Sequence, residues 1–145
     1  TGFPGETEAH VQELAEFIEE SHFERLGVFT YSLEPDTPAA KLSEHLSDEV
    51  KARRRDHLMQ LQQRLAFDWC ARQVGNALEV ILDKVVDASA NVWLGRSFAD
   101  APDVDAVVFV TGQKRYPLAA GQIVPVEIVG HRDYDLIAAA IGPPR

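Results

Sequence analysis

The chain has 145 residues, of which 46% are hydrophobic and 26% are charged, which is typical of a folded protein and not of a disordered one. Its formal net charge of −9 argues against generic binding to a nucleic-acid backbone, which requires clustered Lys and Arg. The single cysteine, Cys70, excludes an internal disulfide, a thiolate zinc site and an iron–sulfur cluster held by this chain alone. With no run of about 18 apolar residues and no signal-peptide pattern at the start, neither a membrane span nor a leader is expected.

Residues 1–74 predict a helix, a strand and a second, long helix. Thr7 is a suitable N-cap, and apolar residues follow it at the spacing of an amphipathic helix, namely Val11, Leu14, Ala15 and Ile18. Residues 26–31 (LGVFTY) are short, apolar and rich in strand formers, which predicts a buried strand. Two prolines mark residues 33–38 as a loop, and the second helix is expected from about Ser47 to Gln73.

Beyond Gly75 the sequence changes to Val, Ile and Ala with frequent turn residues, so a domain boundary is expected between Arg72 and Asn76. Turn signals divide this second part into five short apolar segments. Strands are predicted at residues 77–86, 92–96, 106–111, 123–129 and 136–140. Five short strands with no helix between them favour a small closed barrel of the OB type.

The first part of the chain does not form a complete sheet by itself. An apolar strand such as residues 26–31 requires neighbours on its edges, as in a parallel α/β sheet, yet residues 8–74 offer no second strand. Residues 1–5 (TGFPG) resemble a strand end followed by a strand-to-helix turn. We therefore expect a C-terminal piece of a larger α/β protein. The alternative is a complete protein whose helices pack on the barrel.

Three segments resemble the methylthiotransferase branch of the radical S-adenosylmethionine enzymes. These are residues 2–8 (GFPGETE), residues 26–32 (LGVFTYS) with 37–40 (TPAA), and residues 95–105 (GRSFADAPDVD), the last of which resembles the C-terminal TRAM domain of that family. The resemblance implies that residues 1–74 are the last strand–helix units of a partial TIM-type barrel with its linking helix. Residues 75–145 are then a five-stranded, OB-like TRAM barrel.

The third segment is most similar to the enzymes that methylthiolate an aspartate of a basic small-subunit ribosomal protein, which makes that protein the implied partner. A tRNA methylthiotransferase of the same superfamily is the first alternative, although RNA is less favoured by the negative charge. A stand-alone TRAM-like binding module is the second. The family implies S-adenosylmethionine and two 4Fe-4S clusters as cofactors of a cytoplasmic enzyme. Because the cluster cysteines are absent, this chain is expected to bind no cluster and to be inactive without the missing N-terminal part.

The resemblance places the cofactor side of the site at the turn and at the following strand end. The candidate cofactor-binding residues are Gly2, Pro4, Gly5, Glu6, Tyr31 and Ser32. Glycines around a proline suit a sharp turn with φ > 0 or a close backbone approach, and side chains at the C-terminal ends of barrel strands line active sites. The alternative is a turn and a half-buried aromatic without ligand contact. No catalytic or metal-binding residue is expected, because the five histidines lack ligand spacing.

An acidic loop is the candidate surface for a basic protein partner, since complementary charge steers encounter. Its residues are Arg96, Asp100, Asp103 and Asp105, and the alternative is a solvated loop without a partner. The basic cluster at residues 53–55, with Arg25 and Lys51, is expected to be a solvated helix face paired with Glu49 and Asp56. Trp93 and Phe98 are expected to be either core residues or binding anchors.

Overall fold

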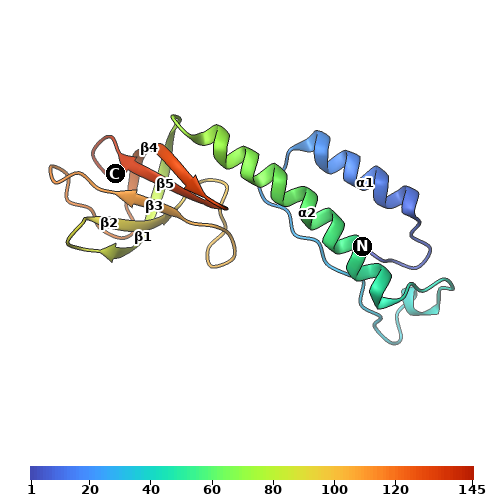
Figure 1. The fold of residues 1–145 in the computed structure, drawn as a ribbon. Helices are drawn as coiled ribbons and strands as arrows, with labels where there is room; N and C mark the ends of the chain where they lie inside the picture. Colours follow the sequence, from blue (N-terminus) through green and yellow to red (C-terminus); the bar gives the residue numbers. More distant parts are fainter. The chain divides into compact units, whose positions relative to one another are not determined.

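The computed structural model describes all 145 residues, which divide into two compact units, Thr1–Leu65 and Ala66–Arg145 (Figure 1). The second unit begins inside a helix, because the last turns of that helix bury Trp69 and Cys70 in the core of the following barrel. The boundary expected from composition lies several residues later, where the helix ends. Neither helix is long and apolar enough to cross a membrane.

The first unit is built on two helices, as predicted. Helix α1 (Glu8–Ser21) begins after Thr7, whose side chain accepts a hydrogen bond from the backbone N–H of His10 in a capping box. Helix α2 (Asp48–Gln73) supplies the opposing face through its residues up to Leu65. The buried core of this unit consists of Val11, Ala15, Ile18, Leu58 and Leu61. Between the helices lies one short 3₁₀ helix, η1 (Ala39–Lys41).

The strand predicted at residues 26–31 does not form. Leu26 and Val28 pack against the helical core, but Phe29 is 83% exposed and the segment is extended without a ladder. Its one β-type contact is with Thr1, whose N-terminal amino group donates to the Phe29 carbonyl at 2.7 Å and whose carbonyl accepts from Tyr31 N–H at 2.7 Å. A single residue cannot supply a strand, so the sequence pattern has no partner within this unit.

The second unit is the closed five-stranded barrel that the sequence predicts (Figure 1). Its strands are β1 (Ala77–Asp87), β2 (Val92–Arg96), β3 (Val108–Thr111), β4 (Ile123–Arg132) and β5 (Asp135–Ala140). They close in the order β1-β2-β3-β5-β4, with β3 and β5 parallel and every other pair antiparallel. Alternate residues point inward, including Val80, Leu82, Val108, Val110, Val124, Val126, Ile128, Leu136, Ala138 and Ala140.

Gly95 marks the closest approach in the barrel wall. A Cβ atom at this position would lie 2.5 Å from the Ile81 carbonyl oxygen and 2.6 Å from Val80 Cγ1. Both residues belong to β1, which pairs with β2 here. The glycine therefore lets two neighbouring strands pack without displacing the ladder.

Candidate functional site

The turn at residues 2–6 is shaped by its two glycines. Gly2 and Gly5 have φ values of 88° and 82°, in the left-handed region that disfavours other residues. A Cβ atom on Gly2 would lie 2.5 Å from Lys51 Cγ, so the turn also approaches α2 closely. The expected turn geometry is confirmed. Its role toward a cofactor stays a prediction.

The Glu6 carboxylate stabilises this turn through hydrogen bonds. It accepts hydrogen bonds from Thr1 Oγ1 at 2.8 Å, from Gly2 N–H at 2.9 Å and from Arg54 Nη1 at 2.9 Å. Burial acts to raise the pKa of Glu6, but these hydrogen bonds outweigh burial and lower the pKa below its ordinary value. Glu6 is therefore an ionised group occupied by intramolecular donors. The N–H groups of Gly2 and Gly5 are also engaged, with the Glu6 carboxylate and the Glu44 carbonyl, so contact of the turn with a ligand stays a prediction.

Arg54 holds the turn and the start of α1 against α2. Its Nη1 donates to the Glu6 carbonyl and carboxylate, both at 2.9 Å, and its Nε and Nη2 donate to Glu8 Oε1 at 3.1 and 2.8 Å. The Arg54 hydrogen bond lowers the pKa of Glu8. The Arg54 side chain is only 6% exposed.

The expectation of a solvated basic face is therefore wrong at Arg54, and wrong at Lys51, which is buried and pairs with Asp48. It holds at Arg55, which pairs with Asp56 at 2.7 Å on the exposed side. The spacing of Arg54 from the apolar residues of the same helix could have predicted its burial. Arg54 lies four residues before Leu58, so both share the face that α2 buries.

Tyr31 lies against the same turn. Its ring contacts the Phe3 ring edge-on, with 5.4 Å between the ring centroids, and stacks with the His45 ring, with 6.1 Å between the centroids. The Lys51 Nζ atom lies over the same ring, 5.6 Å from its centroid. Its hydroxyl is buried and has no hydrogen-bond partner. Ser32 instead donates to Glu34 at 3.1 Å on the exposed side. Two motifs predicted separately, the turn and the strand end, are thus brought together around one free polar group.

In the barrel loop at residues 97–105, most of the acidic side chains accept hydrogen bonds from other residues of the same loop. Asp100 is 8% exposed and accepts from Ser97 N–H at 3.1 Å and Ser97 Oγ at 2.6 Å. Asp105 accepts from Ala101 N–H at 2.8 Å. Asp103 is exposed and adopts φ 60°. Of the three predicted partner-binding carboxylates, Asp103 alone is fully exposed.

The neighbours of this loop fall into two groups. Arg96 makes a two-point ion pair with Asp83, each contact 2.9 Å long, and this hydrogen bonding raises the pKa of Arg96. Phe98 is 75% exposed and is not a core residue, whereas Trp93 is half-buried and packs on the barrel core. No group of three His, Cys, Asp or Glu side chains is arranged to hold a metal.

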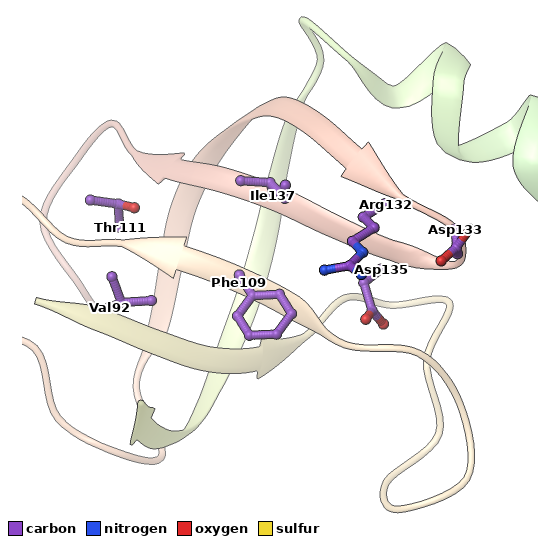
Figure 2. Close-up of a pocket in the computed structure, with 7 residues that line it drawn as sticks. All are labelled: Val92, Phe109, Thr111, Arg132, Asp133, Asp135 and Ile137. Carbon is purple, nitrogen blue, oxygen red and sulfur yellow. The ribbon is translucent and has the colours of Figure 1, made fainter. Parts of the chain in front are cut away.

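A pocket of about 550 Å³ opens on the outer wall of the barrel (Figure 2). Strands β2, β3 and β5, the end of β4 and the turn between β4 and β5 form it, and the side chains that line it are Val92, Phe109, Thr111, Arg132, Asp133, Asp135 and Ile137. No pattern in the sequence predicts this pocket. Its residues are spread over four strands and one turn, and only the barrel register brings them together.

Comparisons with known proteins agree with this architecture. The family model of the TRAM domain matches residues 74–141, which is most of the second unit. The protein named ribosomal protein uS12 methylthiotransferase RimO from Lachnoclostridium phytofermentans is 43% identical over 141 residues, covering 97% of this chain and 31% of the relative. The chain is a relative of RimO.

RimO proteins of other bacteria match equally widely. Those from Synechococcus sp. (strain JA-3-3Ab) and Clostridioides difficile (strain 630) are 43% and 40% identical, over 99% and 94% of this chain and 30% of each relative. The chain thus spans about three tenths of the length of the RimO proteins it matches. The resemblance to the C-terminal part of a methylthiotransferase with a TRAM domain is confirmed.

Proposed function

We propose that the chain is the C-terminal part of a RimO-like methylthiotransferase, which adds a methylthio group to the β-carbon of an aspartate in a small-subunit ribosomal protein. The observation that carries this proposal is the span of the similarity. RimO proteins match 94–99% of the chain, which includes both the helical unit and the barrel. A TRAM-like module that works alone would not require the helical unit to be similar as well.

The hydrogen bonds of Thr1 support a strand–helix unit in the first part. The N-terminal amino group of Thr1 donates to Phe29 O and Thr1 O accepts from Tyr31 N–H, and these two bonds connect the same positions as a parallel bridge. Helix α1 connects the two bridged positions, as a crossover helix does in a parallel sheet. In the intact enzyme, residues 26–31 would then be a wall strand of the radical barrel, with Phe29 covered by neighbouring elements.

S-adenosylmethionine fits the corner formed by the turn and Tyr31, because Tyr31 Oη is a buried donor without a partner. The backbone at Gly2 and Gly5 would approach that cofactor closely, and Tyr31 Oη would donate to one of its polar atoms. The 4Fe-4S clusters do not fit this chain, whose only thiol, Cys70, is fully buried and donates to the Tyr134 carbonyl. When bound, S-adenosylmethionine supplies the radical chemistry of this family.

The proposal is tested by comparing two substrates. The chain is titrated with purified ribosomal protein uS12 and, separately, with a tRNA anticodon stem-loop at several salt concentrations. We expect binding to uS12 that weakens as salt rises, because an acidic chain attracts a basic protein through screened charges. Tight, salt-sensitive binding of the stem-loop with none of uS12 would contradict the proposal and favour a tRNA methylthiotransferase.

A further inference from the structure

The pocket on the barrel wall has an apolar floor built by strand alternation. Val108, Val110, Leu136 and Ala138 fill the barrel core. The residues between them, Phe109 and Ile137, therefore point outward, and they are direct partners in the parallel β3–β5 ladder. Val92 extends this floor onto β2, and Ile137 remains 39% exposed. An uncovered apolar floor of this kind suits the methylene stem of a long side chain.

One end of the floor is acidic. Asp133 lies in the turn between β4 and β5, and Asp135 opens β5 (Figure 2). Asp135 Oδ1 accepts from Val107 N–H at 3.0 Å, which fixes the carboxylate and leaves its second oxygen available. Arg132 is the only basic residue lining the pocket, so the pocket carries a net negative charge. None of the ion pairs of the chain includes Arg132.

This combination distinguishes two kinds of ligand. A single-stranded nucleic acid could stack a base on Phe109 and place a phosphate at Arg132, but it would meet two carboxylates there. A Lys or Arg side chain could lie on Phe109 and Ile137 and place its cationic head at Asp133 and Asp135. Arg132 could then donate to a backbone carbonyl of the same segment. Charge complementarity favours the basic protein segment.

We propose that this pocket is a docking site for a basic side chain of an extended protein segment. Its stem lies on Phe109 and Ile137, and its head lies between Asp133 and Asp135. The docking of such a side chain stands on the pocket itself, whereas the identity of its owner as the ribosomal protein rests on the proposed function. The contact surface then shifts from the loop at residues 97–105, where Asp100 and Asp105 are occupied, to the face formed by β3 and β5.

The test uses the full chain and nuclear magnetic resonance titrations with three probes. These are a short acetylated and amidated peptide in which Arg alternates with Val, the same peptide with Glu in place of Arg, and oligouridylate. The double variant Asp133→Asn/Asp135→Asn removes the acidic end while Asn keeps an acceptor for Val107 N–H. Arg132→Gln removes the cation. Glu127→Gln, at an exposed β4 position outside the pocket, is the matched control.

We expect the Arg peptide to shift amide signals of Phe109, Asp135 and Ile137, and the Glu peptide to leave them unchanged. The double Asp variant should weaken peptide binding about 2- to 30-fold, the range for two partly exposed charge pairs, and Arg132→Gln should tighten it. Glu127→Gln should bind like the unmodified chain. These signs are opposite to those expected for RNA.

Absence of peptide shifts at the pocket, or equal affinity of the double Asp variant, would overturn the proposal. So would oligouridylate binding that Arg132→Gln weakens and the double Asp variant strengthens, because that result assigns the pocket to RNA. The proposed function fails separately. If uS12 does not bind but the Arg peptide maps to the pocket, the ribosomal assignment is lost and the docking site stands. If uS12 binds with unchanged affinity in the double Asp variant, the ribosomal assignment stands and the pocket is not the docking site.

Discussion

Arg54 connects three parts of the helical unit through one guanidinium group. Its five donors allow simultaneous contacts from α2 with the Glu6 carbonyl and carboxylate in the turn and with Glu8 at the start of α1, which a single ammonium cannot reproduce. Its partner Glu6 in turn holds Thr1 and Gly2. The position of the turn therefore depends on a helix residue about fifty positions away in the sequence.

Replacing Arg54 should destabilise the helical unit. Arg54→Met leaves the Glu6 carboxylate without its charged donor and should cost about 1–3 kcal/mol of unfolding free energy, with Arg54→Lys intermediate. Arg55→Met is the control, since Arg55 is 44% exposed and should change stability by less than about 0.5 kcal/mol. Hydrogen exchange of α1 amides measures the effect. Equal protection in the Arg54 and Arg55 variants would show that the ion pairs do not support the unit.

At the scale of elements, sequence patterns predicted the helices and strands that depend only on the local spacing of apolar residues. Both helices and all five barrel strands were predicted, with differences at their ends, such as β3 beginning at Val108 and β4 continuing to Arg132. Residues 26–31 have the same apolar, β-branched character but form no strand, because a strand requires a neighbour that local sequence cannot provide. The pocket was not predictable for a related reason. Phe109 and Ile137 become neighbours only through the parallel register of β3 and β5.

The two extended segments should differ in hydrogen exchange. Residues 77–86 lie in the closed barrel and have ladder partners along their length, in β4 up to Ile81 and in β2 from Ile81 onward, whereas residues 26–32 have the single bridge to Thr1. We expect fast exchange throughout residues 26–32 except at Tyr31 N–H, and slow exchange in the inward-facing half of β1. Helix α1 serves as an internal control for folding of the first unit. Equal, strong protection in both segments would contradict the unpaired state of residues 26–31.

The barrel wall should be sensitive to one methyl group at Gly95. Gly95→Ala places a Cβ atom at 2.5 Å from the Ile81 carbonyl, so β1 and β2 must separate, and we expect a loss of about 1–3 kcal/mol in unfolding free energy. Gly130→Ala is the matched control, because nothing lies within 4 Å of a Cβ atom there. Denaturant unfolding followed by the fluorescence of Trp93 and Trp69 reports on the barrel. Equal unfolding midpoints for the two variants would show that β1 and β2 can separate at Gly95 without a loss of stability.

For the molecule as a whole, the two units differ in what each would contribute to the proposed RimO-like enzyme. The barrel is closed, has its own buried core and matches a domain family by itself. The helical unit has an exposed Phe29 and an extended segment bridged by one residue. Closed barrels have no strand edges to satisfy, whereas an extended apolar segment requires further strands. The barrel therefore suits a role in docking, and the helical unit suits a role in completing a larger sheet.

Cluster chemistry should be absent from this chain in isolation. A 4Fe-4S cluster is held by several thiolates, and the chain supplies only Cys70, which is 0% exposed in the barrel core. After anaerobic reconstitution with iron and sulfide, we expect far less than one cluster per chain by metal and sulfide analysis and no cluster absorbance. Cys70→Ser is the control, and any residual iron should be the same in both proteins because it is not bound through the thiol. A stoichiometric cluster that Cys70→Ser abolishes would instead require Cys70 to leave the core and act with thiols of other chains, and would contradict the proposal that the cluster ligands of the intact enzyme lie outside this chain.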